Sequence, residues 1–351
     1  MTQGASLKNR ITRAALTRAV TFGAKRLIIF LTPGFEARNG GVLAIFAMMR
    51  ETLALRHLHR ARVALCAVPG DDPFFFKYTW FDNRDYLLDL ETVLKSCRRV
   101  DYLQLHVPAY AINQVLDWLT AAAPTLLRNI REVHLNVLLF NIDSIQRQDV
   151  KGLTRFGRVT ATTAHEAYTN STIREALGVS LHRLSVCNGP EIYSVSGYED
   201  KDPLLVVSPD GHALKGEVLQ QIATICPKIR IQIIENLHYR DYLELARRAK
   251  WALTFGEGLD GYFAEPVWSG GLSFAVFNDR FFTPAFAQLE TIYPSWEALM
   301  EKMPLDLQRL DEPVAYNRCW RKTYSLLNDL YSVEGYRKNL RMFYRGEYTF
   351  P

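Results

Sequence analysis

Two glutamates with seven residues between them, Glu257 and Glu265, are the side chains whose type and spacing point most directly to chemistry. Three glycines share the segment 254–271 with them: Gly256, Gly258 and Gly261. Carboxylates accept hydrogen bonds from sugar hydroxyl groups, and glycine lets the backbone approach an anion closely. This combination predicts a site for a nucleotide-sugar, because such a ligand presents hydroxyl groups and phosphates side by side.

The residues around the two glutamates predict the elements that must position them. The apolar run 251–255 is typical of a short buried strand, residues 262–269 of a helix, and residues 272–277 of the next strand. In open α/β sheets, ligands bind at the carboxyl ends of strands, where the amides of the following helix point outward. We therefore expect Glu257, at the strand end, and Glu265, inside the helix, to face one ligand.

This segment resembles the Glu-x7-Glu motif of retaining glycosyltransferases with the GT-B fold, of the group 1 or family 4 type. The family form is Glu-Gly-Phe-Gly followed by Glu-Ala, whereas this chain has Leu259-Asp260 for Phe-Gly and Pro266 for Ala. The resemblance implies that Glu257 orients hydroxyl groups of the donor sugar during catalysis and that Glu265 holds the nucleotide ribose. It also implies donor contacts from the turn residues Gly258, Leu259, Asp260, Gly261 and Tyr262.

Further positions match the family in their order along the chain. The resemblance places Gly40 and Gly41, which precede an apolar helix pattern, beside the donor diphosphate and the acceptor. His106, at the end of a predicted strand, corresponds to a histidine that contacts the donor sugar, and Lys215 to a lysine that binds the diphosphate. The arginine that usually accompanies this lysine is missing, and a protonated His212 is the side chain that would substitute for it.

The composition indicates a soluble globular protein with enough chain for two cores. The 351 residues are 48% hydrophobic and 23% charged, and no apolar run approaches the ~20 residues that span a bilayer. The five cysteines are scattered and lack Cys-x-x-Cys spacing, which favours a reducing, cytoplasmic location and disfavours structural zinc. The acidic pair in Asp200-Lys-Asp202 precedes a predicted strand, so we interpret it as solvated charge and expect no metal.

Residues 8–26 contain only basic charges, interleaved with apolar residues: Lys8, Arg10, Arg13, Arg18, Lys25 and Arg26. This pattern is typical either of a frayed terminal helix or of a basic amphipathic helix in peripheral contact with the inner face of a membrane. The net charge is only +5, and charges elsewhere are mixed in sign. We therefore expect no nucleic-acid partner.

Alternating strand and helix patterns predict an α/β protein with parallel sheets. With the resemblance, they predict the GT-B fold, in which two Rossmann-like domains face a central cleft. The expected divisions are a basic segment (1–24), an acceptor-side domain (25–195), a nucleotide-sugar-binding domain (204–312) and helices crossing back toward the first domain (313–351). The aromatic stretch 69–85 is either an acceptor surface or a local hydrophobic plug.

The function implied by the resemblance is retaining transfer of a hexosyl or deoxyhexosyl group, without an obligatory metal or other cofactor. The donor is a nucleotide-diphosphate-sugar of unidentified base, and the acceptor is a glycan or a lipid-linked saccharide in surface polysaccharide biosynthesis. Two alternatives stay open. One is a sugar-nucleotide epimerase of related fold, and the other is a catalytically degenerate binding subunit, which the missing arginine would explain.

Overall fold

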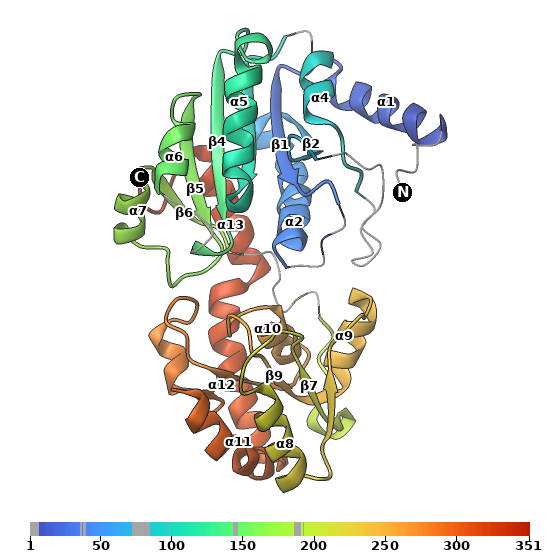
Figure 1. Ribbon diagram of the computed structural model, residues 1–351, viewed down its shortest axis with the longest axis vertical. Coiled ribbons are helices and arrows are strands. Elements are labelled where there is room, and N and C mark those ends of the chain that lie inside the picture. Colours follow the sequence, from blue (N-terminus) through green and yellow to red (C-terminus); the bar gives the residue numbers. More distant parts are fainter. Residues whose placement is uncertain are drawn as a thin grey trace. The chain divides into compact units, whose positions relative to one another are not determined.

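The computed structural model describes residues 7–35, 37, 40–71, 85–97, 99–142, 147–185, 191 and 193–351. The chain divides into two compact units (Figure 1). The first unit comprises residues 1–186 together with 336–351, and the second comprises residues 187–335. Most of the aromatic stretch 69–85 lies outside the described residues, so both interpretations of it stay predictions.

The first unit is built on a six-stranded parallel sheet with the order β2-β1-β3-β4-β5-β6. Its strands are β1 (Arg26–Thr32), β2 (Arg62–Ala67), β3 (Tyr102–Pro108), β4 (Glu132–Leu139), β5 (Arg158–Thr163) and β6 (Ser180–Arg183). In most of these strands, the residues that follow the first one or two are buried. This is expected of a parallel sheet that is covered on both faces.

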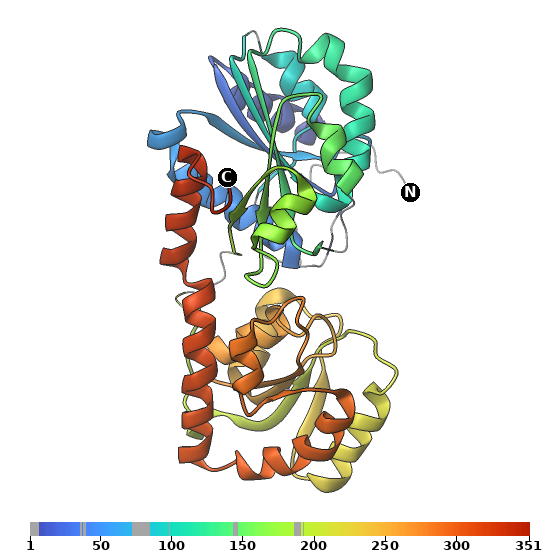
Figure 2. The same cartoon turned by 90° about the vertical axis from the view of Figure 1, so that its left-hand side faces the viewer.

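Helices of the first unit are α1 (Leu7–Thr21), α2 (Gly40–Ala54), α3 (Arg56–His59), α4 (Leu90–Ser96), α5 (Ile112–Leu126), α6 (Arg147–Leu153), α7 (Ser171–Leu177) and most of α13 (Val333–Arg345). Parallel strands are joined by right-handed crossovers. The strand order therefore puts α4 to α7 on one face of the sheet and α2 on the other. Tyr344 of α13 bonds to Thr52 of α2 at 2.9 Å, so α13 shares the face of α2 (Figure 2).

The second unit contains a five-stranded parallel sheet with the order β11-β10-β9-β7-β8. Its strands are β7 (Asp202–Val207), β8 (Arg230–Ile233), β9 (Ala249–Leu253), β10 (Leu272–Val276) and β11 (Ile292–Tyr293). Its helices are α8 (Lys215–Ile225), α9 (Tyr239–Arg248), α10 (Gly261–Trp268), α11 (Trp296–Arg309) and α12 (Pro313–Tyr331).

Two apolar clusters hold the second sheet. The larger one packs α8, α11 and α12 against buried strand residues such as Trp251 and Phe274, and the smaller one packs α9 against Leu204 and Val206. Pro266 lies inside α10, which ends only two residues later. Among the helices that the structure describes, none has both the length and the apolar character needed to cross a bilayer.

The strand orders locate the place in each sheet where a ligand is expected. From β7 the chain moves to β8 on one side and then to β9 on the other, so the strand order reverses between β7 and β9. In the first sheet it reverses between β1 and β3. Ligands of open α/β sheets bind beyond the carboxyl ends of the strands at such switch points.

Candidate functional site

Two loops meet at the switch point of the second sheet, one after β7 and one after β9. The amide of Ser208 donates to the Leu253 carbonyl oxygen at 2.9 Å, and the amide of Phe255 donates to Ser208 Oγ at 2.9 Å. Because these bonds continue the pairing of β7 with β9, the segments 208–214 and 254–260 start side by side. The Glu257 turn predicted from the sequence therefore lies at the switch point.

Two glycines allow the loops to approach each other and the turn to close. A Cβ atom on Gly256 would lie 2.8 Å from Oδ2 of Asp210. Gly258 has a φ of +90°, and a Cβ atom there would lie 2.5 Å from the ring of Phe282. A side chain at Gly256 would require the Asp210 carboxyl group to move, and at Gly258 the backbone conformation itself favours glycine.

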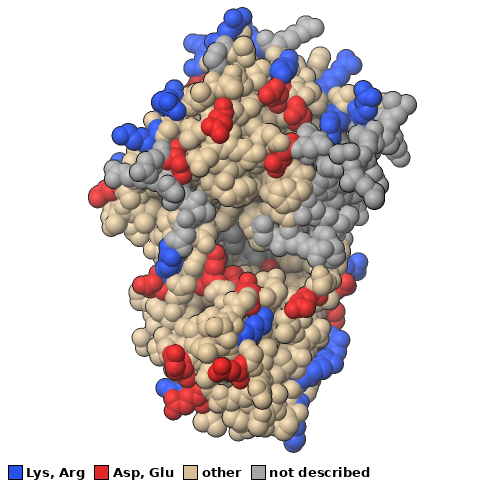
Figure 3. Space-filling view, viewed as in Figure 1, with Lys and Arg blue, Asp and Glu red and all other residues tan. Residues whose placement is uncertain are grey.

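An acidic group surrounds this turn. Asp260 caps α10 by accepting a hydrogen bond from the amide of Phe263 at 3.0 Å. Burial and the neighbouring carboxylates of Asp210 and Glu257 raise the pKa of Asp260 to about 7. Oδ2 of Asp210 is buried and has no hydrogen-bond partner among the described residues. Acidic side chains gather around α10 on the face shown in Figure 3.

Glu265, the second glutamate of the motif, is held inside the second unit. Only 4% of its surface is exposed. Its Oε1 accepts hydrogen bonds from the hydroxyl groups of Tyr193, at 3.1 Å, and of Tyr239, at 2.8 Å. Trp268 stacks on Tyr193 at 5.3 Å between ring centroids. Burial, with the nearby Glu265 charge, raises the pKa of both phenols, so they remain donors to the carboxylate.

Glu257 differs from Glu265 in its exposure. It lies in the open part of the turn and is half-buried, four residues beyond the end of β9. Tyr262, in the first turn of α10, is also half-buried, whereas Leu259 is buried in the unit. Glu257 and the amides at the start of α10 are therefore the motif atoms best placed to meet a ligand from solvent.

His212 lies in the loop after β7 and Lys215 is the first residue of α8, and both side chains already have partners there. Nζ of Lys215 donates to the carbonyl oxygens of Ser208, at 2.7 Å, and of Asp210, at 2.9 Å. His212 accepts from the amide of Leu214 at 3.2 Å and packs 4.1 Å from the ring of Trp296. A bound diphosphate would have to draw Lys215 away from these carbonyls.

His106 is a fully buried core residue. β3 continues past it to Pro108, and its ring stacks on Phe30 at 4.2 Å. Nδ1 lies 3.1 Å from Asn136 Nδ2, and Nε2 lies 3.3 Å from the Tyr344 hydroxyl. Both ring nitrogens thus have protein partners, which leaves no exposed ring atom for the predicted contact with a donor sugar.

Gly40 and Gly41 form the first residues of α2, after the loop that follows β1. Gly40 is exposed, and a Cβ atom there would have no neighbour within 4 Å among the described residues. The start of α2 lies on the carboxyl side of the first sheet, where helix amides can meet an anion.

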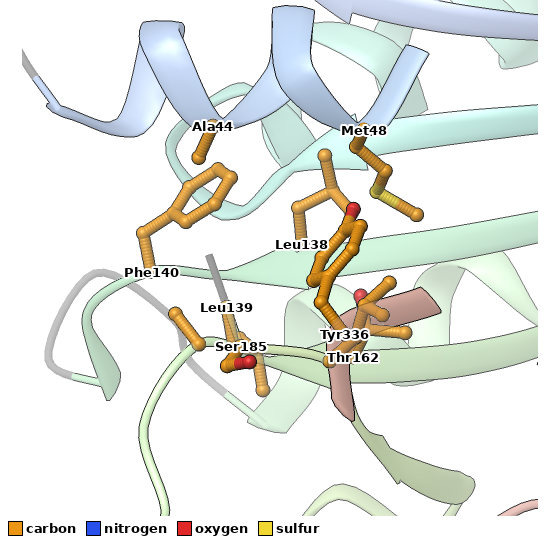
Figure 4. Close-up of a pocket in the computed structure, with 10 residues that line it drawn as sticks. Ala44, Met48, Leu138, Leu139, Phe140, Thr162, Ser185 and Tyr336 are labelled. Carbon is orange, nitrogen blue, oxygen red and sulfur yellow. The ribbon is translucent and has the colours of Figure 1, made fainter. Parts of the chain in front are cut away.

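Neither described cavity encloses the predicted donor contacts. One has a volume of about 20 Å³, enough for a single water molecule. It lies at the carboxyl ends of β4 to β6, between Met48 of α2 and Tyr336 of α13, and its lining is mainly apolar (Figure 4). The other, of about 400 Å³, is open and lies between α9 and Tyr193. Among the described residues, no group of three histidine, cysteine or acidic side chains could hold a metal ion.

The structure is similar to solved structures with the GT-B fold. Anabaena Alr3699/HepE in complex with UDP-glucose matches 91% of this chain and 99% of its own, with a TM-score of 0.62 and 9% identity. Sucrose-phosphate synthase (tll1590) from Thermosynechococcus elongatus matches 92% and 98%, with a TM-score of 0.53 and 9% identity. An α,α-trehalose-phosphate synthase (UDP-forming) from Burkholderia vietnamiensis matches 92% and 97%, with a TM-score of 0.52 and 11% identity.

No protein-family model matches the sequence, and neither does a curated protein. At these identities the likeness concerns the fold alone. It confirms the predicted α/β class with two Rossmann-like parallel sheets of the GT-B type.

Sequence reasoning missed the side chains that surround the motif. Tyr193 and Tyr239 stand 72 and 26 residues from Glu265, and nothing in the local sequence links them to it. Asp210 could have been noticed in the sequence, because it follows a predicted strand and precedes a glycine at the place where the family that the sequence resembles has an arginine. Its buried oxygen beside Gly256 makes it part of the same acidic turn.

Proposed function

We propose that this chain is a glycosyltransferase that moves a sugar from a uridine-diphosphate donor to a glycan or lipid-linked acceptor, with retention at the anomeric carbon. The observation that carries the proposal is the turn 254–261 at the switch point of the second sheet, in which Glu257 is only half-buried. The uridine base is suggested by the similar structures, of which one contains UDP-glucose and another is a UDP-forming synthase.

In the proposed reaction, the bond between the anomeric carbon and the diphosphate breaks while negative charge builds on the departing diphosphate. Amides of the first turn of α10 would stabilise this charge, together with Lys215 once it leaves its two carbonyl partners. Glu257 would accept hydrogen bonds from the donor sugar and thereby orient it. We assign Glu265 to holding the turn through its tyrosines rather than to the ribose, and we assign no metal to the reaction.

A thermal-shift panel of UDP, GDP and ADP tests the donor. Nucleotide at about 100 times its dissociation constant should stabilise the protein by about 2.7 kcal/mol, and we expect UDP to act at the lowest concentration. Stabilisation by GDP or ADP but not UDP would remove the assigned base. No response to any of the three would remove the donor site.

Transfer is then tested with Glu257→Gln, which keeps the size of the side chain but removes its charge. We expect the rate of UDP release in the presence of acceptor to fall at least about a hundredfold, with an unchanged melting temperature. Glu301→Gln is the control, because Glu301 is exposed on α11. Wild-type turnover in Glu257→Gln would contradict the assigned role.

A binding subunit without turnover is the second candidate. The observation that favours it is the segment between β7 and α8, where Asp210-Gly211-His212 replaces the expected arginine, while Lys215 at the start of α8 is already bonded to two carbonyl oxygens. UDP binding without release of nucleotide from any donor would select this candidate. Interconversion of UDP-sugars without an acceptor would instead select an epimerase.

A further inference from the structure

The amino-terminal edge of the first sheet carries a row of cations. β1, β2 and β5 each begin with an arginine, and arginines also precede β3 and β4. We call these side chains the basic edge: Lys25, Arg26, Arg56, Arg60, Arg62, Arg99, Arg128, Arg131, Arg155 and Arg158. In the strand-start segments 22–26, 54–62, 99–102, 126–132 and 153–158, the acids are Asp101 and Glu132.

Backbone pairing brings these separate segments into one continuous row. Leu27 is in register with Arg62, and Arg26 with Tyr102. Tyr102 pairs in turn with Glu132, and His134 with Arg158. Adjacent strands lie about 4.8 Å apart, so the starts of five strands span about 20 Å. A surface of this width concentrates positive charge over a distance greater than the Debye length of about 8 Å in physiological salt.

Most cations of the basic edge are exposed and have no acidic partner. Arg99 pairs weakly with Asp101, at 3.6 Å, and its side chain is 80% exposed. Arg26 packs over the ring of Tyr102, 3.9 Å from its centroid. Among the described residues of the basic edge, seven exposed arginines form no ion pair: Arg56, Arg60, Arg62, Arg128, Arg131, Arg155 and Arg158. Lys and Arg side chains line the outer border of this unit in Figure 3.

Exposed apolar side chains adjoin this charge. Phe22 is 72% exposed and stands three residues before Lys25, at the end of α1. Ile11 of the same helix is 61% exposed, and Arg18 between them is also exposed. Positions 11, 18 and 22 lie on one side of a helix. Exposed apolar residues beside arginines suit the headgroup region of a bilayer, where rings insert while cations meet phosphate.

We infer that the basic edge, with Phe22 and Ile11, is a docking surface for an anionic lipid bilayer. The sequence pattern of residues 8–26 covers only one end of this surface, and the remaining cations are contributed by four other segments of the chain. A bilayer fits better than a nucleic acid, because Phe22 and Ile11 project with no hydrogen-bonding group and the row carries no series of exposed rings for stacking bases. This inference is independent of the proposed glycosyl transfer.

Co-sedimentation of the full chain with vesicles tests it. We expect binding to vesicles of phosphatidylcholine mixed with phosphatidylglycerol, and none to phosphatidylcholine alone. Binding should be lost at about 1 M salt, where the Debye length falls to about 3 Å. The triple variant Arg60→Glu/Arg62→Glu/Arg131→Glu should bind at least about a hundredfold more weakly, and Phe22→Ser about tenfold more weakly with the same salt dependence.

The matched control is Lys228→Glu/Lys302→Glu/Arg321→Glu, which reverses three exposed cations of the second unit. It changes the net charge equally and should retain vesicle binding. Circular dichroism of both triple variants establishes that each is folded. Equal losses in the two triple variants would show that only net charge matters and would overturn the assignment. Binding of duplex DNA that requires the basic edge, without binding of vesicles, would overturn it in favour of a nucleic-acid partner.

Discussion

The two units of this protein expose the polar side chains of their parallel strands and strand-end loops in opposite ways. In the first unit, His106, His134 and Asn136 lie inside the strands and are sealed beneath α13. In the second unit, Glu257 lies in the turn beyond the strand and is only half-buried. Polar side chains are therefore enclosed by the protein in the first unit, whereas Glu257 in the second unit keeps part of its surface exposed to a ligand.

The difference shows that a few residues along a strand decide whether a titratable group can act on a ligand. His106, two residues before the end of β3, is desolvated, and burial lowers its pKa well below the usual value. A buried polar group must find partners within the protein, so its hydrogen-bonding capacity is consumed there. Loop groups beyond the strand end keep part of that capacity for a ligand.

The largest effect is expected in the second unit, where the turn depends on backbone geometry. Gly258→Ala should destabilise the unit by about 3 kcal/mol, because the new Cβ combines an unfavourable positive φ with overlap on the Phe282 ring. Chemical denaturation measures the change. Gly216→Ala is the control, since a Cβ there meets nothing within 4 Å and the residue is helical. Equal stability of the two variants would show that the turn tolerates a side chain.

A smaller effect, confined to the first unit, is expected on acidification. Burial lowers the pKa of His134 to about 3. Between this value and the unfolded pKa of about 6.5, only the unfolded state takes up the proton. The contribution of His134 to the free energy of unfolding is therefore fully present above pH 6.5 and falls as the pH is lowered. At about pH 5 this one histidine should cost about 2 kcal/mol, and His59, His106 and His182 add losses in the same direction.

Hydrogen exchange of β4 amides at about pH 7.5 and pH 5 measures the acid effect locally. His134→Gln should reduce the number of protons taken up on unfolding by about one, and so lower the slope of the free energy of unfolding against pH. His57→Gln should leave it unchanged, because His57 is exposed. If the amides of the second unit lost protection first, the contrast between the two units would be wrong.

The smallest effect concerns the tyrosines that hold Glu265. Tyr239→Phe removes one of two hydroxyl donors to Oε1 and should cost about 1.5 kcal/mol. UDP affinity should change little, because Glu265 is assigned to the turn and not to the ribose. Tyr324→Phe is the control, since no hydrogen bond is formed by its hydroxyl within the described residues. Loss of UDP affinity far beyond the loss of stability would return Glu265 to the ligand.

Much of the fold was predictable because its strands and turns depend on local sequence patterns. Apolar runs such as 251–255 marked the buried strands, and Gly256 and Gly258 marked the turn that follows. The start of α4 at Leu90 is less evident from the sequence, because it is set by Asp89, which caps the helix by accepting from the amide of Thr92. Such boundaries depend on single side-chain contacts, which the periodicity of a sequence does not record.

The role of His106 was not predictable in the same way. The sequence alternates polar and apolar residues through β3 and β4, with Gln104 and His106 in one strand and His134 and Asn136 in the other. This alternation indicates that the polar residues share a face of the sheet, but not what covers that face. The cover is Phe343 of α13, more than 200 positions later in the chain, whose ring packs against His106 and His134.

The sequence by itself determined the succession of strands and helices, the glycine turn and the presence of Glu257 in the loop that follows a strand. Those features follow from backbone geometry and from the burial of neighbouring residues. Only the tertiary structure decided that Glu265 is bound by two distant tyrosines and that arginines from five segments form one edge. Such contacts join residues far apart in the chain, and their partners are fixed by strand order and helix packing rather than by any local pattern.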